Sequence, residues 1–170
     1  MAARRMLSKQ VAVEPKWRNH SAETDRIRAA SKGRACQGSG MGEGDALYLR
    51  NAGEAASLLA PLLADARREW LMVAHIAGDH RLLKLVRGSE GARDQVSIPA
   101  RAILVDAIRL GSQRLILAHC HPSGDPAPSA HDIAATRRLA DMATVIGISL
   151  EDHLIFAGGD CRSFRALGLL

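Results

Sequence analysis

One stretch of this chain restricts its fold more than any other, and residues 119–132 read HCHPSGDPAPSAHD. The apolar run 114–118 in front of it is short and is closed by turn-forming residues, as buried strands are. Because alternate residues of a strand face the same side about 6.5 Å apart, His119 and His121 can reach one ion. The prolines and the glycine that follow predict a tight loop, which brings the next helix back over the end of the strand.

The start of that helix offers a third group for the same ion. Asp132 falls in the first turn, where it can supply an oxygen ligand, and Ser129 stands three residues before it. The spacing Ser-x-x-Asp is also typical of a helix N-cap, and a capped first turn would fix the direction of the carboxylate. Two histidines and one carboxylate leave a fourth position open, as in catalytic zinc sites. These ligands favour zinc over calcium or magnesium, with iron, cobalt and nickel as alternatives.

Residues 119–132 resemble the motif of the JAB/MPN metalloproteases, His-x-His-Pro followed by Ser-x-x-Asp. The residues within the motif are similar to those of the bacterial RadC-like branch of that superfamily. Glu69 opens the apolar run 69–76, where RadC-like chains carry a glutamate before a core strand. Residues 150–155, LEDHLI, resemble a later strand of the family, and Ser-Phe at 163–164 resembles its C-terminal end. The resemblance covers roughly residues 45–170. It implies an α/β fold of JAB/MPN (cytidine-deaminase-like) type, a mixed β-sheet flanked by helices in a single domain.

The same resemblance implies a set of roles. His119, His121 and Asp132 would hold Zn²⁺, and Ser129 would hydrogen-bond the attacking water and steady the oxyanion. Glu69 would act as general base and pass the proton to the leaving amine, although the sequence alone does not bring it near the metal. The chain is therefore predicted to be a zinc-dependent hydrolase, a metallopeptidase that cleaves peptide or isopeptide bonds in a peptide or protein substrate.

Strand and helix geometry also predicts where one cysteine and three other histidines lie. Cys120, where the family usually has asparagine, should face away from the ion and pack in the core. His75 shares a strand face with Glu69, so it is a candidate for contact with the site. His153 is predicted to be buried and hydrogen-bonded rather than to touch substrate, and His131 is predicted to face solvent.

The charge of the chain is concentrated near its start. The formal net charge of the whole chain is +5. Residues 1–44 hold nine lysines and arginines against four acids, which accounts for this +5, and the remainder balances at zero. We expect a disordered basic tail ending in the glycine-rich 38–44, followed by the domain at 45–170. A neutral domain lacks the electrostatic footprint of nucleic-acid binding, so any weak DNA contact would come from the tail. The alternative function is a DNA-repair-associated accessory or DNA-binding protein without protease activity.

Compartment and membrane association follow from cysteine usage and hydropathy. Three scattered cysteines form neither a disulfide framework nor a zinc pair, which suits a reducing cytoplasm. No apolar run approaches the about 20 residues needed to cross a bilayer. We therefore expect a cytoplasmic protein without membrane contact.

The remaining elements follow from periodicity and turn signals. Asn51 should cap a helix that buries its leucines at 58, 59, 62 and 63. A helix at 100–110 should bury Ile103, Leu104, Ala107 and Ile108 and stop at Gly111. The other predicted elements are a short strand at 46–49, strands at 70–77, 81–87, 114–119 and 148–156, and a helix at 129–145.

Overall fold

The structure of the chain is a computed structural model that describes residues 46–63, 69–88 and 98–170. The predicted basic tail at 1–44 and nearly all of the polar stretch after the second strand lie outside these residues. The described elements are α2 Ala52–Leu63, β1 Leu71–Ile76, β2 Leu82–Arg87, α3 Ala100–Leu110, β3 Arg114–Cys120, α4 Ala130–Val145, β4 Ser149–Ala157 and β5 Asp160–Ser163. The predicted mixed α/β fold is confirmed, and the strands and helices predicted from 70 onward agree with these bounds within one residue.

The strands form one mixed sheet in the order β2-β1-β3-β4-β5. β1 pairs with β2 and β3 in antiparallel fashion, β3 and β4 run parallel, and β5 returns beside β4. β1 is buried along its whole length, as a central strand covered on both faces must be. The two parallel strands finish at the same edge of the sheet, which is where the functional residues gather.

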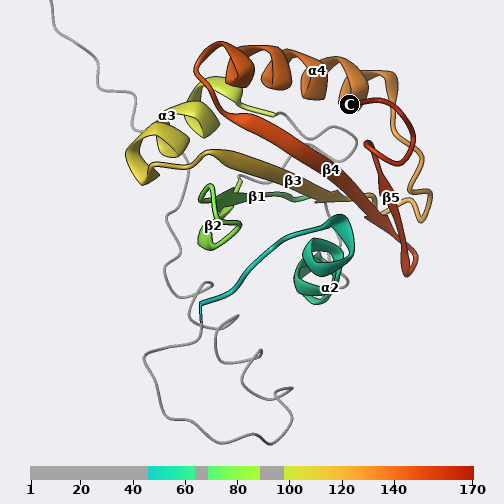
Figure 1. The fold of residues 1–170 in the computed structure, drawn as a ribbon. Helices are drawn as coiled ribbons and strands as arrows, with labels where there is room; N and C mark the ends of the chain where they lie inside the picture. Colours follow the sequence, from blue (N-terminus) through green and yellow to red (C-terminus); the bar gives the residue numbers. More distant parts are fainter. Residues whose placement is uncertain (1–45, 64–68, 89–97) are drawn as a thin grey trace, which may run out of the picture.

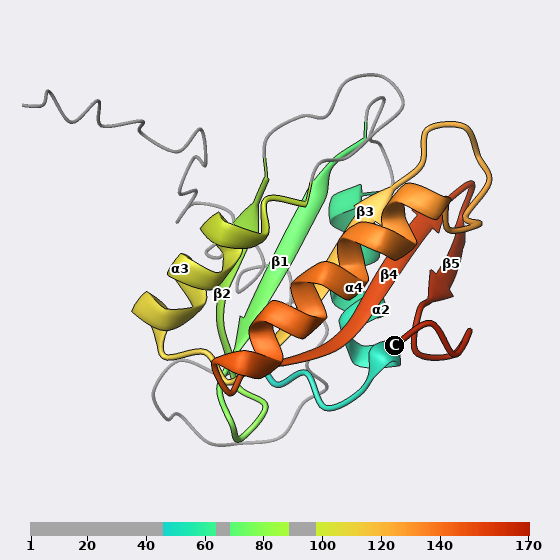
Figure 2. The ribbon, with the colours of Figure 1, turned by 90° about the horizontal axis from the view of Figure 1, so that it is seen from above.

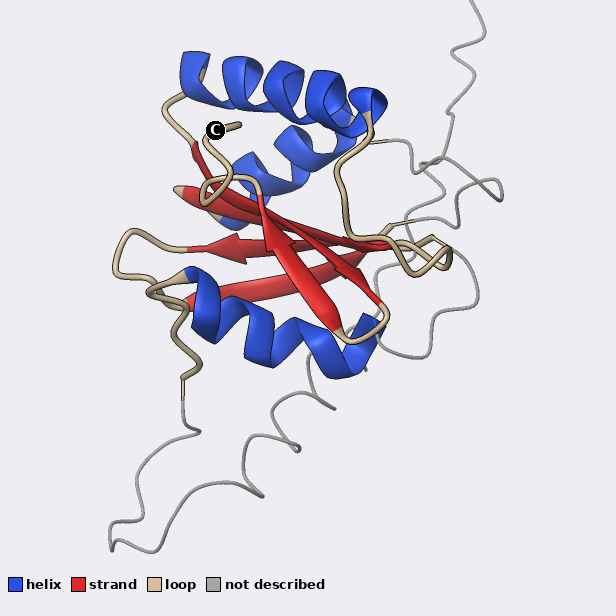
Figure 3. Cartoon of the chain, turned by 90° about the vertical axis from the view of Figure 1, so that its right-hand side faces the viewer, coloured by secondary structure: helices blue, strands red, loops and turns tan. Residues whose placement is uncertain are grey.

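Helices cover the sheet on both sides (Figures 1 and 3). α2 lies against one face, whereas α3 and α4 lie side by side over the other face (Figure 2). Strand alternation separates two apolar clusters. Met72, Ala74 and Cys120 pack on the α2 side, and Leu71 and Leu117 pack on the α3 and α4 side.

A bulge in β4 reverses this alternation within the strand. Leu115 pairs with Leu150, but the next residue of β3 pairs with Asp152, so Glu151 is an extra residue. Leu150 packs on the α3 and α4 side, whereas Leu154 packs on the α2 side. An extra residue shifts every later side chain of the strand to the opposite face. As a result, the odd-numbered residues after the bulge face α4.

The helix ends follow the expected chemistry, whereas one buried position was predicted wrongly. The side chain of Asn51 accepts a hydrogen bond from the Glu54 amide at 2.8 Å, and Gly111 closes α3 in the left-handed conformation with φ +67°. The prediction for Ile108 was wrong. Its side chain is 64% exposed, because the turn of helix that meets the sheet is filled by residues 103, 104 and 107.

The segment 46–49 is not a full strand, since only Tyr48 forms a β-bridge, to Arg81. Within the described ranges, none of the helices has the length and apolar character that crossing a membrane requires.

Candidate metal centre

β3 carries the first histidine of the site to the edge of the sheet where it ends together with β4. His119 is 1% exposed and faces α4, while Cys120 points to the opposite side and packs among the residues beneath α2. The predicted alternation of these two neighbours is confirmed. Burial also raises the pKa of the Cys120 thiol, so this cysteine is a neutral core residue rather than a ligand.

His121 follows β3 directly and is fixed by two backbone contacts. Its amide donates to the carbonyl of Phe156 at 2.8 Å, and its Nδ1 lies 2.8 Å from the carbonyl oxygen of Asp125. A carbonyl can only accept, so the ring proton is on Nδ1. The lone pair of the neutral ring is therefore on Nε2, the atom that points toward His119.

The capped start of α4 supplies the carboxylate. Ser129 has extended backbone angles, and its hydroxyl oxygen accepts a hydrogen bond from the Asp132 amide at 3.1 Å. The Asp132 carboxylate in turn accepts from the amide of Ser129 at 2.9 Å and from its hydroxyl. This reciprocal capping box confirms the N-cap interpretation of Ser-x-x-Asp. Asp132 is only 5% exposed, so the cap holds its carboxylate in one direction.

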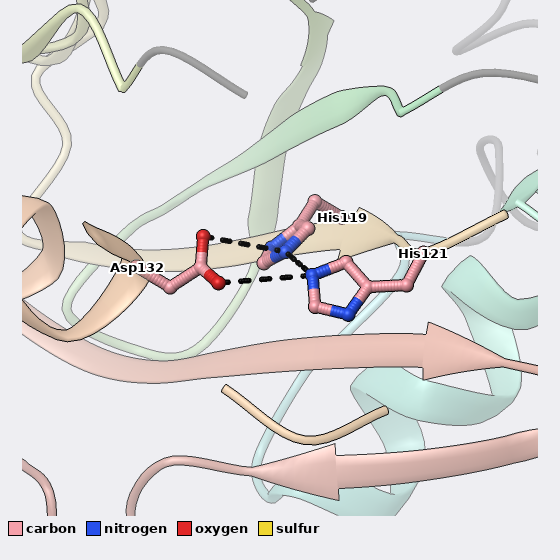
Figure 4. Close-up of side chains that lie close together, drawn as sticks. All are labelled: His119, His121 and Asp132. Atoms are coloured by element: carbon pink, nitrogen blue, oxygen red, sulfur yellow. Dashed lines mark hydrogen bonds and ion pairs between the residues drawn. The ribbon is translucent and has the colours of Figure 1, made fainter. Parts of the chain in front are cut away.

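The three groups converge on one point (Figure 4). The Nε2 atoms of His119 and His121 are 2.8 Å apart, and they lie 3.6 and 3.7 Å from the two carboxylate oxygens of Asp132. Ligands about 2.0–2.1 Å from a tetrahedral zinc ion are about 3.3 Å from one another. The three separations bracket this value, so the residues fit a small divalent ion and supply three of the four ligands of a tetrahedral site.

A second layer behind His119 was not predicted from the sequence. His153 on β4 is fully buried, as expected, and its Nε2 lies 2.8 Å from Nδ1 of His119. Its own Nδ1 lies 2.7 Å from the hydroxyl of Thr136 on α4. When Nε2 of His119 binds a metal, its Nδ1–H donates to His153, whose Nδ1–H donates to Thr136. Only the pairing of β3 with β4 brings these residues together.

Burial keeps the inner histidine in the form that binds metal. It lowers the pKa of His119 to about 4; the nearby Asp132 raises that pKa, and His121 lowers it. The pKa of His153 lies well below its usual value, again because of burial and then because of the two other histidines. Neutral imidazoles have the lone pairs that ligation requires, so the site is ready to bind metal at neutral pH.

Glu69 lies outside the cluster of potential ligands. Among the described residues, the cluster whose ligand atoms all lie within 4.8 Å of one another consists of His119, His121 and Asp132. Glu69 is half-buried two positions before Leu71, which pairs with His119. Its charge also acts on the neighbouring Cys120 thiol. These observations fit a carboxylate near the site that is not a ligand, and its role as a base stays a prediction.

Two other histidines lie apart from this cluster. The suggestion that His75 contacts the site was wrong, since it pairs with Leu115 at the other end of β3 and lies 3.2 Å from the hydroxyl of Ser112. His131 is exposed on α4, as predicted. Neighbouring positions of a helix point about 100° apart, which is why it turns away from the site while Asp132 turns inward.

A cavity of about 330 Å³ opens beside His121 on the α2 side of the sheet. Its walls come from the end of α2, the loop after β3 and the turn between β4 and β5. A molecule that enters from solvent can therefore reach the half-buried imidazole of His121.

Comparison with known proteins gives consistent matches. A family model described as RadC-like JAB domain matches residues 49–169. A UPF0758 protein of Pelobacter propionicus is 39% identical over 108 residues, which are 64% of this chain and 47% of the relative. UPF0758 protein GSU0386 of Geobacter sulfurreducens is 38% identical over 106 residues, which are 62% of this chain and 46% of the relative. UPF0758 protein STH371 of Symbiobacterium thermophilum is 39% identical over 112 residues, which are 66% of this chain and 48% of the relative. The chain thus spans about half the length of these relatives, and the resemblance inferred from its motifs is confirmed.

Proposed function

Since this chain belongs to the RadC-like JAB domain family, we propose that it is a zinc-dependent hydrolase that cleaves peptide or isopeptide bonds with a metal-activated water. The observation that carries the proposal is the convergence of His119, His121 and Asp132 on one point with a fourth position open. Three protein ligands and an open position are the composition of catalytic zinc sites rather than structural ones. Family likeness alone would be an argument by analogy, whereas this geometry is a property of the chain itself.

The surroundings of the cluster support a hydrolytic role. When bound, the ion would lower the pKa of a coordinated water to about 7 and polarise the scissile carbonyl. His119 is shielded from solvent, whereas His121 lines the cavity, so a substrate can approach the cluster past His121. His121 and Asp132 are each held by hydrogen bonds to the backbone around them, which keeps the ligands in position before any substrate arrives.

Two residues beside the ligands have proposed roles in proton transfer and orientation. Glu69 takes the proton of the attacking water and passes it to the leaving amine, as a general base and then a general acid. Ser129 steadies the oxyanion through its hydroxyl, which in the metal-free chain donates to Asp132. The substrate is a peptide or protein.

The experiment is a cleavage screen with a library of N-acetylated peptides, using protein whose zinc content is measured by atomic emission. Glu69→Gln keeps the size of the side chain but removes the base, so cleavage is expected to fall by about 10²–10⁴-fold while zinc is retained. Asp132→Asn should reduce both zinc and cleavage. The matched control is His131→Ala, which removes an exposed imidazole next to Asp132 and should change neither.

Three results would count against the proposal. Zinc-loaded protein that cuts no peptide would overturn the hydrolytic function. Full activity in Glu69→Gln would remove Glu69 from the mechanism. A loss of zinc in that variant as large as its loss of activity would instead make Glu69 a ligand or a structural support.

A further inference from the structure

We propose that the cavity beside His121 binds an apolar side chain of the substrate next to the bond that is cut. This inference rests on the proposed function, because it assumes that the scissile carbonyl lies at the metal centre. It goes beyond that function by naming what the enzyme selects. The cavity lies on the side of the sheet opposite His119 and Asp132 and shares only His121 with the ligands among the described residues.

The cavity and the metal centre share one residue at the edge of the sheet. His119 and Asp132 hold the metal position on the α4 side, and the Cys120 side chain lines the cavity on the α2 side. His121 lies past the end of the strand and belongs to both, since its Nε2 lies toward the metal position and the residue also lines the cavity. A peptide held at the metal centre therefore has a neighbouring residue within reach of the cavity.

Both sites lie where the parallel strands β3 and β4 end. The carboxyl ends of parallel strands are the usual place for ligands in sheets of this kind, because the loops that leave them can diverge and open a crevice. Here the loop after β3 contributes Pro122 and Gly124, and the end of β4 contributes Phe156. The cavity is therefore a feature of the fold's ligand-binding edge rather than an isolated packing defect.

The walls of the cavity favour an apolar occupant. Ala60 and Leu63 from α2 line it together with Pro122 and Phe156. Apolar surface removed from water stabilises a complex, whereas a charged group would lose hydration against these walls without a buried partner. Asp160 also lines the cavity, but its residue is exposed at the start of β5, so its charge stays hydrated.

Three glycines, at positions 124, 158 and 159, line the cavity. Gly124 and Gly159 have φ values of +86° and +92°, and a Cβ atom on either would meet no other atom within 4 Å. Gly158, with φ +56°, approaches the carbonyl oxygen of Gly124, to which a Cβ atom would come within 3.4 Å. The two turns therefore approach each other through backbone atoms of Gly124 and Gly158, and the positions beside Gly124 and Gly159 are open. A volume of about 330 Å³ is at the small end for ligand sites, about 300–1,000 Å³, and suits one side chain.

The test measures binding directly by nuclear magnetic resonance on the zinc-loaded, ¹⁵N-labelled full chain. The probes are N-acetyl-leucinamide, N-acetyl-lysinamide and N-acetyl-glycinamide. The leucine probe should shift the amide signals of Gly124, Gly158 and Gly159 in a saturable way. Gly111 and Gly147 lie at the other end of the sheet and should not move. The glycine probe should bind at least about tenfold more weakly, because it lacks the side chain that is buried.

Two variants on α2 distinguish an effect of filling the cavity from a general effect of adding a phenyl ring to the helix. Ala60→Phe places the ring in the cavity and should weaken the leucine probe at least about tenfold. Ser57→Phe places the same ring on the exposed side of α2 and should leave binding unchanged. If Ala60→Phe does not fold, the comparison of the three probes on the unaltered chain decides.

The proposal is overturned if no probe binds saturably, if leucine binds no better than glycine or lysine, or if a folded Ala60→Phe binds normally. A preference for leucine next to the cut bond in the peptide library, lost in Ala60→Phe, would support it. Because probe binding needs no cleavage, its failure is distinct from that of the hydrolase proposal, which appears as an absence of peptide products.

Discussion

Replacing His153 with leucine is expected to weaken zinc binding by about 10–100-fold, although His153 touches no metal. Partners in the outer layer of metal sites typically contribute this much to affinity. When Nε2 of His119 binds a metal, the His153 ring accepts from Nδ1–H of His119, and these two ring nitrogens are 2.8 Å apart; the other ring nitrogen of His153 is 2.7 Å from the Thr136 hydroxyl. Leucine fills much of the same space but offers no acceptor. The change therefore removes the hydrogen bonds and keeps most of the apolar contact with Phe164, on which the His153 ring is stacked.

The expected loss of zinc affinity follows from the burial of the residues around His153. His119, His153 and Thr136 are 1%, 0% and 0% exposed, so water does not replace the lost partner. A buried polar group left without a partner costs about 1–3 kcal/mol, and a tenfold loss of affinity corresponds to about 1.4 kcal/mol. In the variant, the His119 proton is better placed on Nε2, where it can bond to His121 at 2.8 Å. Metal binding would then have to reverse this tautomer, so part of the cost appears as lost affinity.

The assay is competition for zinc between the metal-free protein and a chelating indicator, with His153→Gln as the matched variant. The glutamine carbonyl can accept from His119, so this variant should recover most of the lost affinity. Thermal melts of the metal-free proteins show whether each variant is folded. Wild-type affinity in a folded His153→Leu protein would refute the reasoning. Equal losses in both variants would assign the effect to the shape of the imidazole and not to the hydrogen bond.

Four further predictions concern the metal, the pH dependence and the helix cap. A variant with alanine at both His119 and His121 should contain no zinc by atomic emission. Removal of zinc from the unaltered chain should lower its melting temperature, since an ion at 100 times its dissociation constant adds about 2.7 kcal/mol; an unchanged melt would contradict this. Burial lowers the pKa of His75 from 6.5 to about 4. The unfolded chain thus binds a proton in this range that the folded chain does not, and stability falls by up to about 1.4 kcal/mol per unit as the pH drops from 6.5 to 4. His75→Gln should reduce that slope in pH-dependent denaturant melts, and identical slopes would show that His75 does not contribute. Ser129→Ala should cost about 0.5–2 kcal/mol in the same melts through loss of the N-cap, and no cost would mean that the cap of Asp132 is redundant.

The local sequence pattern was sufficient to predict a side chain's direction wherever that direction depends on a single strand or helix turn. Alternation along β3 predicted that His119 and Cys120 face opposite sides, and the Ser-x-x-Asp spacing predicted the cap that aims Asp132. Ile108 was mispredicted because helical periodicity gives a face but not its width, which depends on how closely α3 lies on the sheet. His75 was mispredicted because sharing a strand face says nothing about distance along the strand, and the antiparallel register puts it beside Leu115.

The sequence by itself thus determined the three candidate ligands, the elements that carry them and the family of the fold, because these depend on spacings within one strand, one loop and one helix turn. The tertiary structure alone decided that His153 supports His119. Without the extra residue Glu151, the alternation that begins at Leu150 would turn the His153 side chain toward α2. The bulge turns it toward α4, where His119 and Thr136 lie. A bulge arises only when two strands pair, so the side chains of β4 could be assigned to a face only after β4 had been placed beside β3.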